Sequence, residues 1–289
     1  MRQLLAILST VGTLAAALTA CSGHSGSAGA DVFVSRFPVS EVILGADRNY
    51  RITSSEGDTI YLDRYASIHW PITVGDADLK PLHDSLIAYC FADSALTDPE
   101  KGIRRFVTDT SMFTDNDPDA PVSFTAQPID SFPDDVETFG CWFENVTANI
   151  LELDEEKITC QVNISSYLGG AHPVSLSRPF TFDLLSGTVL TVDNIIRPGC
   201  TDSVMPIIIR ALARQLDVPV SGLDRAGIFT SQLTFPGQPY ICKNTLYFHY
   251  NPYDIAPYSS GMIDVAVYPY EVRRFLTPQA RRLFDLGYN

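Results

Sequence analysis

Two kinds of hydrophobic spacing divide this chain into predicted strands and predicted helices. Apolar and polar residues alternate with the period of a half-buried strand in residues 50–53, 59–62, 141–151, 157–165, 180–184, 246–250 and 263–267. Apolar residues recur at helical spacing in residues 79–90, 98–107 and 201–216, and again after Thr277. Because strands and helices do not alternate regularly, the pattern predicts an α+β fold with largely antiparallel sheets and a few packed helices.

The length of the chain predicts more than one folding unit. At about 150 residues per domain, 289 residues correspond to one large or two small domains. We expect two small intertwined domains, residues 31–165 and residues 166–289. Residues 1–20 and 21–30 are expected to precede the fold as a signal peptide and a tether.

The first residues have the pattern of a bacterial export signal. Arg2 is followed by an apolar run over residues 4–17, and small residues lead to Cys21. The ending Leu18-Thr19-Ala20-Cys21 resembles a bacterial lipoprotein signal. That resemblance implies cleavage before Cys21 and a lipid on its sulfur. A single transmembrane anchor is the alternative, but the run is shorter than the roughly 20 residues that span a bilayer.

The residues after Cys21 predict where the protein is held. Residues 22–30 are almost entirely Ser, Gly and Ala, the composition of a flexible tether. Ser22 stands where an Asp retains many Gram-negative lipoproteins at the inner membrane, so we expect the outer membrane. No acidic run of the kind that marks surface export follows Cys21, which favours the periplasmic face.

The chain is acidic, and this limits its partners. Its formal net charge is -14, and removal of Arg2 with the signal peptide makes it -15. Nucleic acid is disfavoured as a partner, because binding to phosphates requires Lys and Arg. A cationic partner is favoured by long-range attraction. A solvated acidic surface without a specific partner is the alternative interpretation.

The cysteines do not form a metal or redox motif. Five follow Cys21, an odd number, and no C-x-x-C pair is present. A disulfide between Cys141 and Cys160 and a set of buried apolar thiols both remain open. The five are Cys90, Cys141, Cys160, Cys200 and Cys242.

Residues 109–135 are rich in Asp, Pro, Ser and Thr, which predicts a long irregular insertion. Its carboxylates at Asp115, Asp117 and Asp119 have the spacing with which an EF-hand loop begins. However, Ala120 occupies the position that requires Gly, and the last position of the loop lacks Glu. We interpret the array as a solvated acidic loop, and no cofactor or metal is predicted.

Two loops carry the candidate binding residues. The first, residues 167–173, places adjacent glycines before an imidazole, and a structural turn is the alternative to a binding loop. The second, residues 251–261, is stiffened by two prolines and carries tyrosines, which are common interface anchors. The predicted binding residues are Tyr167, Gly169, Gly170, His172, Asn251, Tyr253 and Tyr258.

Three motifs together resemble one protein family. They are residues 166–173 (SYLGGAHP), the turn at 185–187 followed by residues 190–196 (LTVDNII), and residues 248–261 (FHYNPYDIAPYSSG). The chain resembles the paired extracytoplasmic domains of the lysozyme-sensing anti-sigma factor of Gram-positive bacteria. The same domains occur as a non-catalytic module beside a peptidoglycan deacetylase domain. The similarity covers roughly residues 58–275.

The resemblance implies an α+β binding module of the cell envelope, in the best understood case one that grips lysozyme. Two departures limit the transfer. We expect neither a sigma-binding segment nor a spanning helix in this chain. Thr181-Phe182-Asp183 is similar to the start of the deacetylase metal motif, but leucines follow it and no paired-histidine motif is present.

We therefore predict a non-catalytic cell-envelope lipoprotein that binds a lysozyme-like basic protein or a peptidoglycan-type glycan. Family and charge favour the protein. One alternative is a cell-wall hydrolase that uses His172 with an unidentified carboxylate, although no common catalytic motif is present. Another is a structural component of an outer-membrane assembly. His69 and His249 lie in strand-like runs and are interpreted as packed side chains.

Overall fold

A computed structural model describes residues 7–9, 39–114, 122–134, 136 and 141–284. Cys21, the tether and the array from Asp115 to Asp119 lie outside these ranges, so the lipid anchor stays a prediction. No helix in the described ranges combines the length and the apolar character that a membrane crossing requires.

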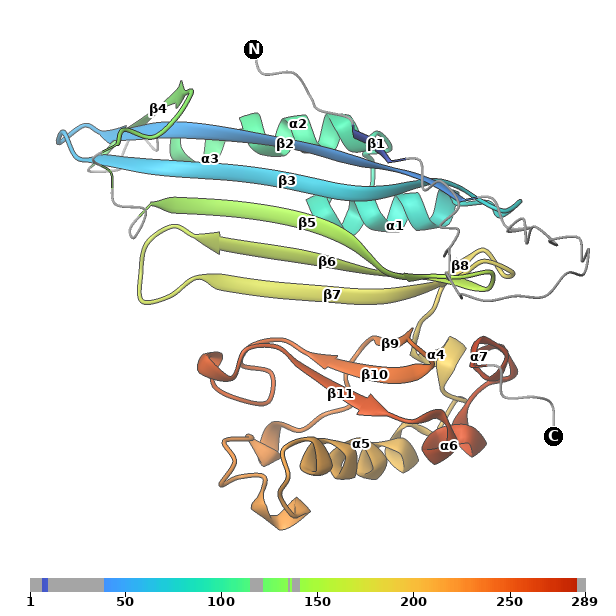
Figure 1. The fold of residues 1–289 in the computed structure, drawn as a ribbon. Coiled ribbons are helices and arrows are strands. Elements are labelled where there is room, and N and C mark those ends of the chain that lie inside the picture. The colour runs from blue at the N-terminus through green and yellow to red at the C-terminus, as the bar shows by residue number, and fades with distance from the viewer. Residues whose placement is uncertain (1–6, 10–38, 115–121, 135, 137–140, 285–289) are drawn as a thin grey trace, which may run out of the picture.

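The N-terminal part of the molecule is built on a large sheet of eight strands (Figure 1). Its order is β1-β2-β3-β5-β6-β7-β8, with β4 also paired to β2. Every pair is antiparallel except β3 and β5. The strands are β1 (Ile7–Ser9), β2 (Val39–Ser54), β3 (Thr59–Val74), β4 (Phe124–Ile129), β5 (Trp142–Leu153), β6 (Lys157–Tyr167), β7 (Val174–Asp183) and β8 (Thr188–Val189).

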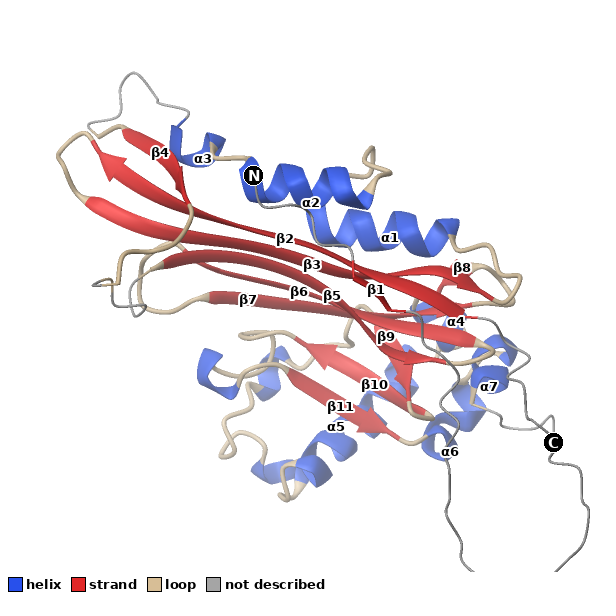
Figure 2. Ribbon diagram, turned by 45° about the horizontal axis from the view of Figure 1, so that its top comes forward, coloured by secondary structure: helices blue, strands red, loops and turns tan. Residues whose placement is uncertain are grey.

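Three helices between β3 and β4 supply the cover for one face of this sheet (Figure 2). They are α1 (Lys80–Phe91), α2 (Pro99–Thr108) and α3 (Ser111–Thr114). α2 begins at Pro99 after Asp98, whose carboxylate accepts a hydrogen bond from the Lys101 N–H. Alternate strand residues complete the core under the helices, among them Val146, Ala148, Cys160, Val162, Phe180 and Phe182.

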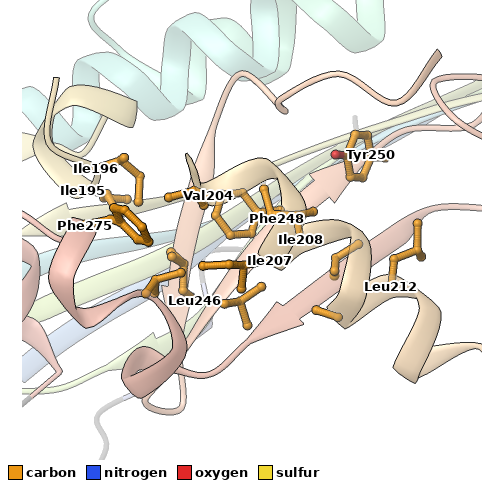
Figure 3. Packing of buried hydrophobic residues seen from close by; sticks show 14 of the residues in the cluster. Ile195, Ile196, Val204, Ile207, Ile208, Leu212, Leu246, Phe248, Tyr250 and Phe275 are labelled. Carbon is orange, nitrogen blue, oxygen red and sulfur yellow. The ribbon is translucent and has the colours of Figure 1, made fainter. Parts of the chain in front are cut away.

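The C-terminal part is a smaller unit with its own sheet, in the order β11-β10-β9. Helix α5 packs on this sheet, with Val204, Ile208 and Leu212 against Leu246 and Phe248 (Figure 3). The unit comprises β9 (Pro239–Cys242), β10 (Thr245–Tyr250), β11 (Ile263–Val267), α4 (Val192–Ile195), α5 (Thr201–Gln215), α6 (Pro269–Val272) and α7 (Pro278–Leu283). Short 3-10 helices cover Val220–Gly222, Thr230–Gln232, Tyr258–Ser260 and Arg273–Phe275.

The smaller unit lies on the side of the large sheet that α1 and α2 leave uncovered (Figure 2). Strand β9 is the edge of the small sheet, and its Ile241 meets two threonines of the large one. The carbonyl oxygen of Ile241 accepts hydrogen bonds from the hydroxyls of Thr159 at 2.5 Å and Thr181 at 3.2 Å. The Ile241 N–H donates to the Thr181 hydroxyl at 2.8 Å. These buried bonds satisfy peptide groups of an edge strand that no further strand pairs.

The α+β class with largely antiparallel sheets is confirmed. The segment 109–135 is more regular than its composition predicts, because it contains α3 and β4. Of the two possibilities left open for Cys160, the structure shows a free buried thiol and not a disulfide to Cys141. The boundary that we expect between residues 165 and 166 falls within β6, and the second hydrophobic core begins at Leu190. The division into domains stays a prediction.

Candidate binding site

The two loops singled out by the sequence meet in space, although they lie 81 residues apart. The Nε2 atom of His172 lies 3.0 Å from the hydroxyl of Tyr253. The imidazole also stacks on the ring of Tyr258, with centroids 3.9 Å apart and planes inclined by 17°. His172, Tyr253 and Tyr258 are called the aromatic cluster below. All seven predicted binding residues belong to these two loops or their immediate flanks.

The first loop joins β6 to β7 and is held by its own hydrogen bonds. Gly169 and Gly170 have φ angles of +94° and +106°, in the region that glycine adopts without strain. The Tyr167 hydroxyl donates to the Gly170 carbonyl oxygen at 3.0 Å. His172 Nδ1 lies 2.8 Å from the Pro173 carbonyl oxygen, which can only accept. In the neutral ring Nδ1 therefore carries the proton, and Nε2 accepts from Tyr253.

The second loop is fixed to the large sheet by Asn251. Its Oδ1 accepts from the backbone N–H of Ser177 at 2.7 Å, and its Nδ2 donates to the carbonyl oxygen of Ser177 at 3.1 Å. Ser177 lies in β7 beyond the two residues that pair with β8, so its peptide groups face an open edge. The amide of Asn251 thus takes the place of a neighbouring strand. Asp254 accepts from the Asn251 N–H at 2.7 Å and closes the turn.

Tyr253 has an unusual backbone conformation. Its φ angle is +72°, and 55% of the residue is exposed. A large residue rarely adopts this left-handed region, and such strain persists only where the surroundings impose it. The Tyr253 N–H donates to the Ala256 carbonyl oxygen at 3.1 Å, which closes a tight turn. The strained turn holds an exposed tyrosine ring in one place.

The hydrogen bonds of His172 differ from those of a catalytic base. Both described partners, the Pro173 carbonyl and the Tyr253 hydroxyl, are neutral. A general base normally has a carboxylate or similar group that orients the ring and stabilises its charged form. The described hydrogen bonds of His172 include no carboxylate. This arrangement suits recognition better than proton transfer.

His249, which lies outside the predicted site, has a carboxylate partner of the kind that His172 lacks. His249 Nδ1 lies 2.8 Å from Asp264 Oδ1, across the pair of β10 and β11. The His249 side chain is only 5% exposed, and its Nε2 is buried without a hydrogen-bond partner in the described structure. Alternation along residues 246–250 indicates that His249 points to the other side of the strand from the core-facing Phe248. Its pairing with Asp264, however, follows only from the strand register.

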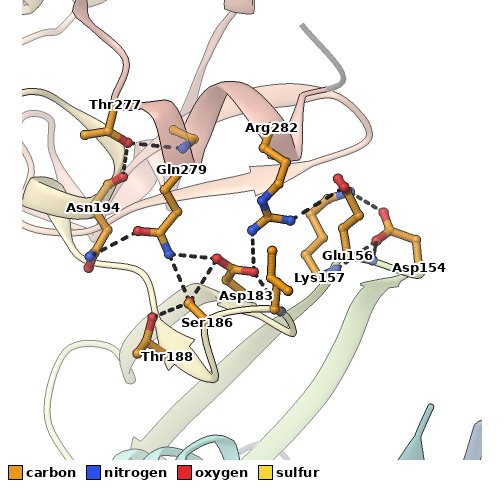
Figure 4. A network of polar contacts seen from close by, with 12 residues as sticks. Asp154, Glu156, Lys157, Asp183, Ser186, Thr188, Asn194, Thr277, Gln279 and Arg282 are labelled. Carbon is orange, nitrogen blue, oxygen red and sulfur yellow. Dashed lines mark hydrogen bonds and ion pairs between the residues drawn. The ribbon is translucent and has the colours of Figure 1, made fainter. Parts of the chain in front are cut away.

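A separate polar network joins β7 to α7 (Figure 4). Arg282 Nη2 donates to Asp183 Oδ1 at 2.6 Å, and Gln279 Nε2 donates to Oδ2 at 2.7 Å. The Ser186 hydroxyl also donates to Oδ2, at 2.9 Å. Burial alone would raise the pKa of Asp183, but the hydrogen bonds from Arg282, Gln279 and Ser186 together lower it. Asp183, which ends the deacetylase-like triplet, therefore has a structural role.

In the described part of the chain, no group of three His, Cys, Asp or Glu side chains converges so as to hold a metal ion. The seven predicted binding residues and the His249–Asp264 pair are thus the main candidates for function.

Residues 193–270 match the model of DUF3298, a family described as a protein of unknown function. The matched range contains the second loop with Asn251, Tyr253 and Tyr258, and ends before α7.

Two crystal structures of DUF3298 proteins resemble the whole fold. One, from Bacteroides fragilis, has a TM-score of 0.62 at 16% identity and covers 84% of this chain and 95% of its own. The other, from Pseudomonas aeruginosa, has a TM-score of 0.56 at 12% identity and covers 84% and 96%. These similarities establish the shared fold.

A curated relative matches a shorter part of the chain. The protein named Esterase Rv3036c, of Mycobacterium tuberculosis, is 41% identical over 66 residues, which is 20% of this chain. The match covers 29% of the length of that relative.

Proposed function

We propose that this protein is a non-catalytic binding module of the bacterial cell envelope, and that its aromatic cluster recognises a basic, lysozyme-like protein. The observation that carries the proposal is the meeting of two distant loops, in which exposed His172 is hydrogen-bonded to exposed Tyr253 and stacks on half-buried Tyr258. The lipid anchor at Cys21 and a place on the periplasmic face of the outer membrane are part of the proposal.

Preorganisation supports this function. A partner that contacts the aromatic cluster does not have to order it, because Asn251 and the strained turn at Tyr253 already do so. Tyrosine supplies a large apolar ring and a hydrogen-bonding hydroxyl, which together make it a frequent anchor in interfaces. The net charge of -14 attracts a basic protein and accelerates its encounter.

The experiment is a titration of the purified full chain with hen egg-white lysozyme at low and moderate salt. Binding is expected to saturate and to weaken with salt, because attraction between opposite net charges is screened. Tyr253→Ala is expected to weaken it about 30-fold, the effect of losing a central aromatic anchor.

Tyr270→Ala is the matched control. Tyr270 is 72% exposed and lies on α6, away from both loops. Its replacement is expected to leave binding unchanged. Failure of the unaltered chain to bind lysozyme, or equal losses in the two variants, would remove the proposal.

A hydrolase remains the second candidate, with its site moved from His172 to His249. The His249–Asp264 pair has the base and orienting carboxylate that an esterase uses, and a relative named as an esterase matches part of the chain. The burial of His249 Nε2 opposes this function, because a base must reach its substrate. Hydrolysis of p-nitrophenyl butyrate by the full chain, abolished in a folded His249→Gln variant, would establish it; a rate equal to buffer would dismiss it.

A further inference from the structure

The helices α1 and α2 leave part of their own face of the large sheet uncovered. Figure 1 shows that β6 and β7 continue past the end of α1 toward the loop that joins them. Side chains two or four residues apart along a strand share a face. Ile164 and Leu176 therefore lie on the same side as Val162 and Phe180, which pack in the core under the helices. This side is the one away from the smaller unit.

Large apolar side chains in the uncovered part are open to solvent. The exposed fraction is 37% for Ile164, 49% for Leu176 and 56% for Val174. Ile164 pairs directly with Val146 of β5 and with Leu176 of β7, so these three form one row across three strands. At the usual strand spacing the row is about 10 Å long. A contiguous exposed apolar patch often marks a binding site, whereas single exposed apolar residues are ordinary.

The row runs into a cavity at the end of α1. The cavity has a volume of about 290 Å³ and is lined by Val146 and Ile164 of the row. At Gly102 of α2 a Cβ atom would lie 2.5 Å from the Phe91 ring, so only glycine lets this ring take its place in the lining. Further apolar lining comes from the helices and the segment between them, namely Cys90, Ala92, Leu96 and Phe106.

The charged residues that line the cavity are held by contacts within the protein. Arg64 pairs with Glu144, to which its Nε donates at 2.7 Å. Arg105 Nη1 donates to Asp93 at 2.8 Å, and Asp109 accepts from the first backbone N–H of α3 at 2.9 Å. The cavity therefore offers a ligand mainly apolar surface, and its volume is close to that of the smallest pockets that hold small molecules, roughly 300 Å³.

A cation lies beside the apolar row. Arg178 follows Leu176 by two residues on the same face of β7, about 7 Å along the strand. Arg178 is exposed, and its guanidinium lies 4.5 Å from the centre of the Tyr89 ring of α1. Among the described residues, no ion pair joins Arg178 to a carboxylate. A guanidinium in this position can bind a carboxylate with two hydrogen bonds.

We propose that this region binds one long-chain carboxylate, an anionic amphiphile. The cavity, the row of Val146, Ile164 and Leu176, and Arg178 beside the row are together called the apolar groove. The hydrocarbon chain lies along the row and its end enters the cavity, while the carboxylate bonds to Arg178. A narrow apolar row beside one cation matches such a ligand in both shape and charge. The flat surface of a membrane would leave the cavity unfilled.

The apolar groove is independent of the function proposed above. The lysozyme-like partner was assigned to exposed side chains of the aromatic cluster, none of which belongs to the groove. The two proposals therefore predict separate losses. Tyr253→Ala is expected to weaken lysozyme binding and retain the carboxylate, and Leu176→Asn is expected to do the opposite.

The test is calorimetric titration of the full chain with sodium dodecanoate, below the concentration at which it forms micelles. We expect one saturable site whose affinity falls with salt, because the contact with Arg178 is screened. Leu176→Asn keeps the approximate size of the side chain but makes it polar, and is expected to weaken binding about tenfold. Arg178→Gln is expected to weaken it about tenfold by removing the charge.

Matched controls make the same changes elsewhere. Leu185→Asn alters a leucine that is exposed in the turn between β7 and β8, and Arg225→Gln removes an exposed arginine of the smaller unit. Both variants are expected to bind dodecanoate like the unaltered chain. Dodecyltrimethylammonium keeps the hydrocarbon chain but reverses the charge of the head, and is expected to bind at least about tenfold more weakly than dodecanoate.

Absence of saturable dodecanoate binding overturns the proposal, as does unchanged binding by a folded Leu176→Asn variant. Equal affinity for dodecyltrimethylammonium would also overturn it, because the cation would then have no part in binding. Two further outcomes assign the groove to another occupant and overturn the proposal as well. They are a dimer, seen by sedimentation, that Leu176→Asn disrupts, and binding to phosphatidylglycerol vesicles without binding to monomeric dodecanoate.

Discussion

The large sheet and the C-terminal unit are joined differently at the two ends of β7. At one end Asp183 is fully buried, and both of its carboxylate oxygens accept hydrogen bonds from Arg282, Gln279 or Ser186. At the other end the contacts are neutral, and the aromatic cluster extends into solvent. At the first end the hydrogen bonds of the buried carboxylate are all made within the protein, so no polar group remains there to bind a ligand. At the second end the side chains are held in place and are also exposed. The difference separates a structural joint from a recognition surface.

The largest expected effect comes from removing the charge of the structural joint. Asp183→Ala leaves Arg282 with Glu156, at 3.5 Å, as its only carboxylate partner among the described residues, and it is expected to lower the free energy of unfolding by about 3 kcal/mol. Urea unfolding monitored by circular dichroism measures this. Asp84→Ala, which breaks an exposed pair with Lys80, is the control and should change stability by less than about 1 kcal/mol. Equal changes would contradict the structural assignment.

The same carboxylate predicts an acid dependence. Because the pKa of Asp183 is lower in the folded protein than in the unfolded chain, its contribution to stability is present above the unfolded value of about 3.9. The contribution is lost as pH falls through the folded pKa. The difference in unfolding free energy between the unaltered protein and Asp183→Asn should therefore narrow in acid. A difference that does not vary with pH would show that the carboxylate charge contributes nothing.

A smaller effect is expected where β9 meets the large sheet. Thr181→Val keeps the shape of the side chain but removes the hydroxyl that bonds to the N–H and carbonyl of Ile241. The buried N–H is left without its partner, so stability is expected to fall by about 2 kcal/mol. Chemical unfolding measures the change, and Thr125→Val at an exposed position is the comparison. Equal losses of stability in the two variants would show that the hydrogen bonds to Ile241 contribute nothing specific.

The smallest change in stability is expected at the recognition surface. Tyr253→Gly removes an exposed ring and the strain of φ +72°, so the free energy of unfolding should rise by less than about 1 kcal/mol. Lysozyme binding should weaken in the same variant about as much as in Tyr253→Ala, roughly 30-fold. Differential scanning calorimetry and the lysozyme titration together test this, and a clear loss of stability would make the aromatic cluster a structural feature.

Helices were predicted correctly where the apolar residues of one short segment define the buried side. The spacing of Leu82, Leu86 and Cys90 predicts α1, and that of Val204 and Ile208 predicts α5. The two candidate loops were also predicted, each from its own glycine, proline and aromatic residues. Their meeting was not predicted, because it depends on the bond between Asn251 and Ser177, which are distant in sequence.

The features that escaped prediction depend on pairing between distant segments. Strand β4 contains Pro128 and lies in a segment of loop-like composition, but an edge strand tolerates Pro and pairs with β2. The pairing of His249 with Asp264 requires the register of β10 and β11.

The amide of Asn251 has a consequence for solubility. Unpaired peptide groups on the edge of a sheet are a template on which another chain can add a strand and begin to aggregate. At Ser177 the Asn251 side chain already occupies those groups. The loop that orients the aromatic cluster therefore also protects the edge of β7, so that a high concentration of molecules would not favour strand exchange there.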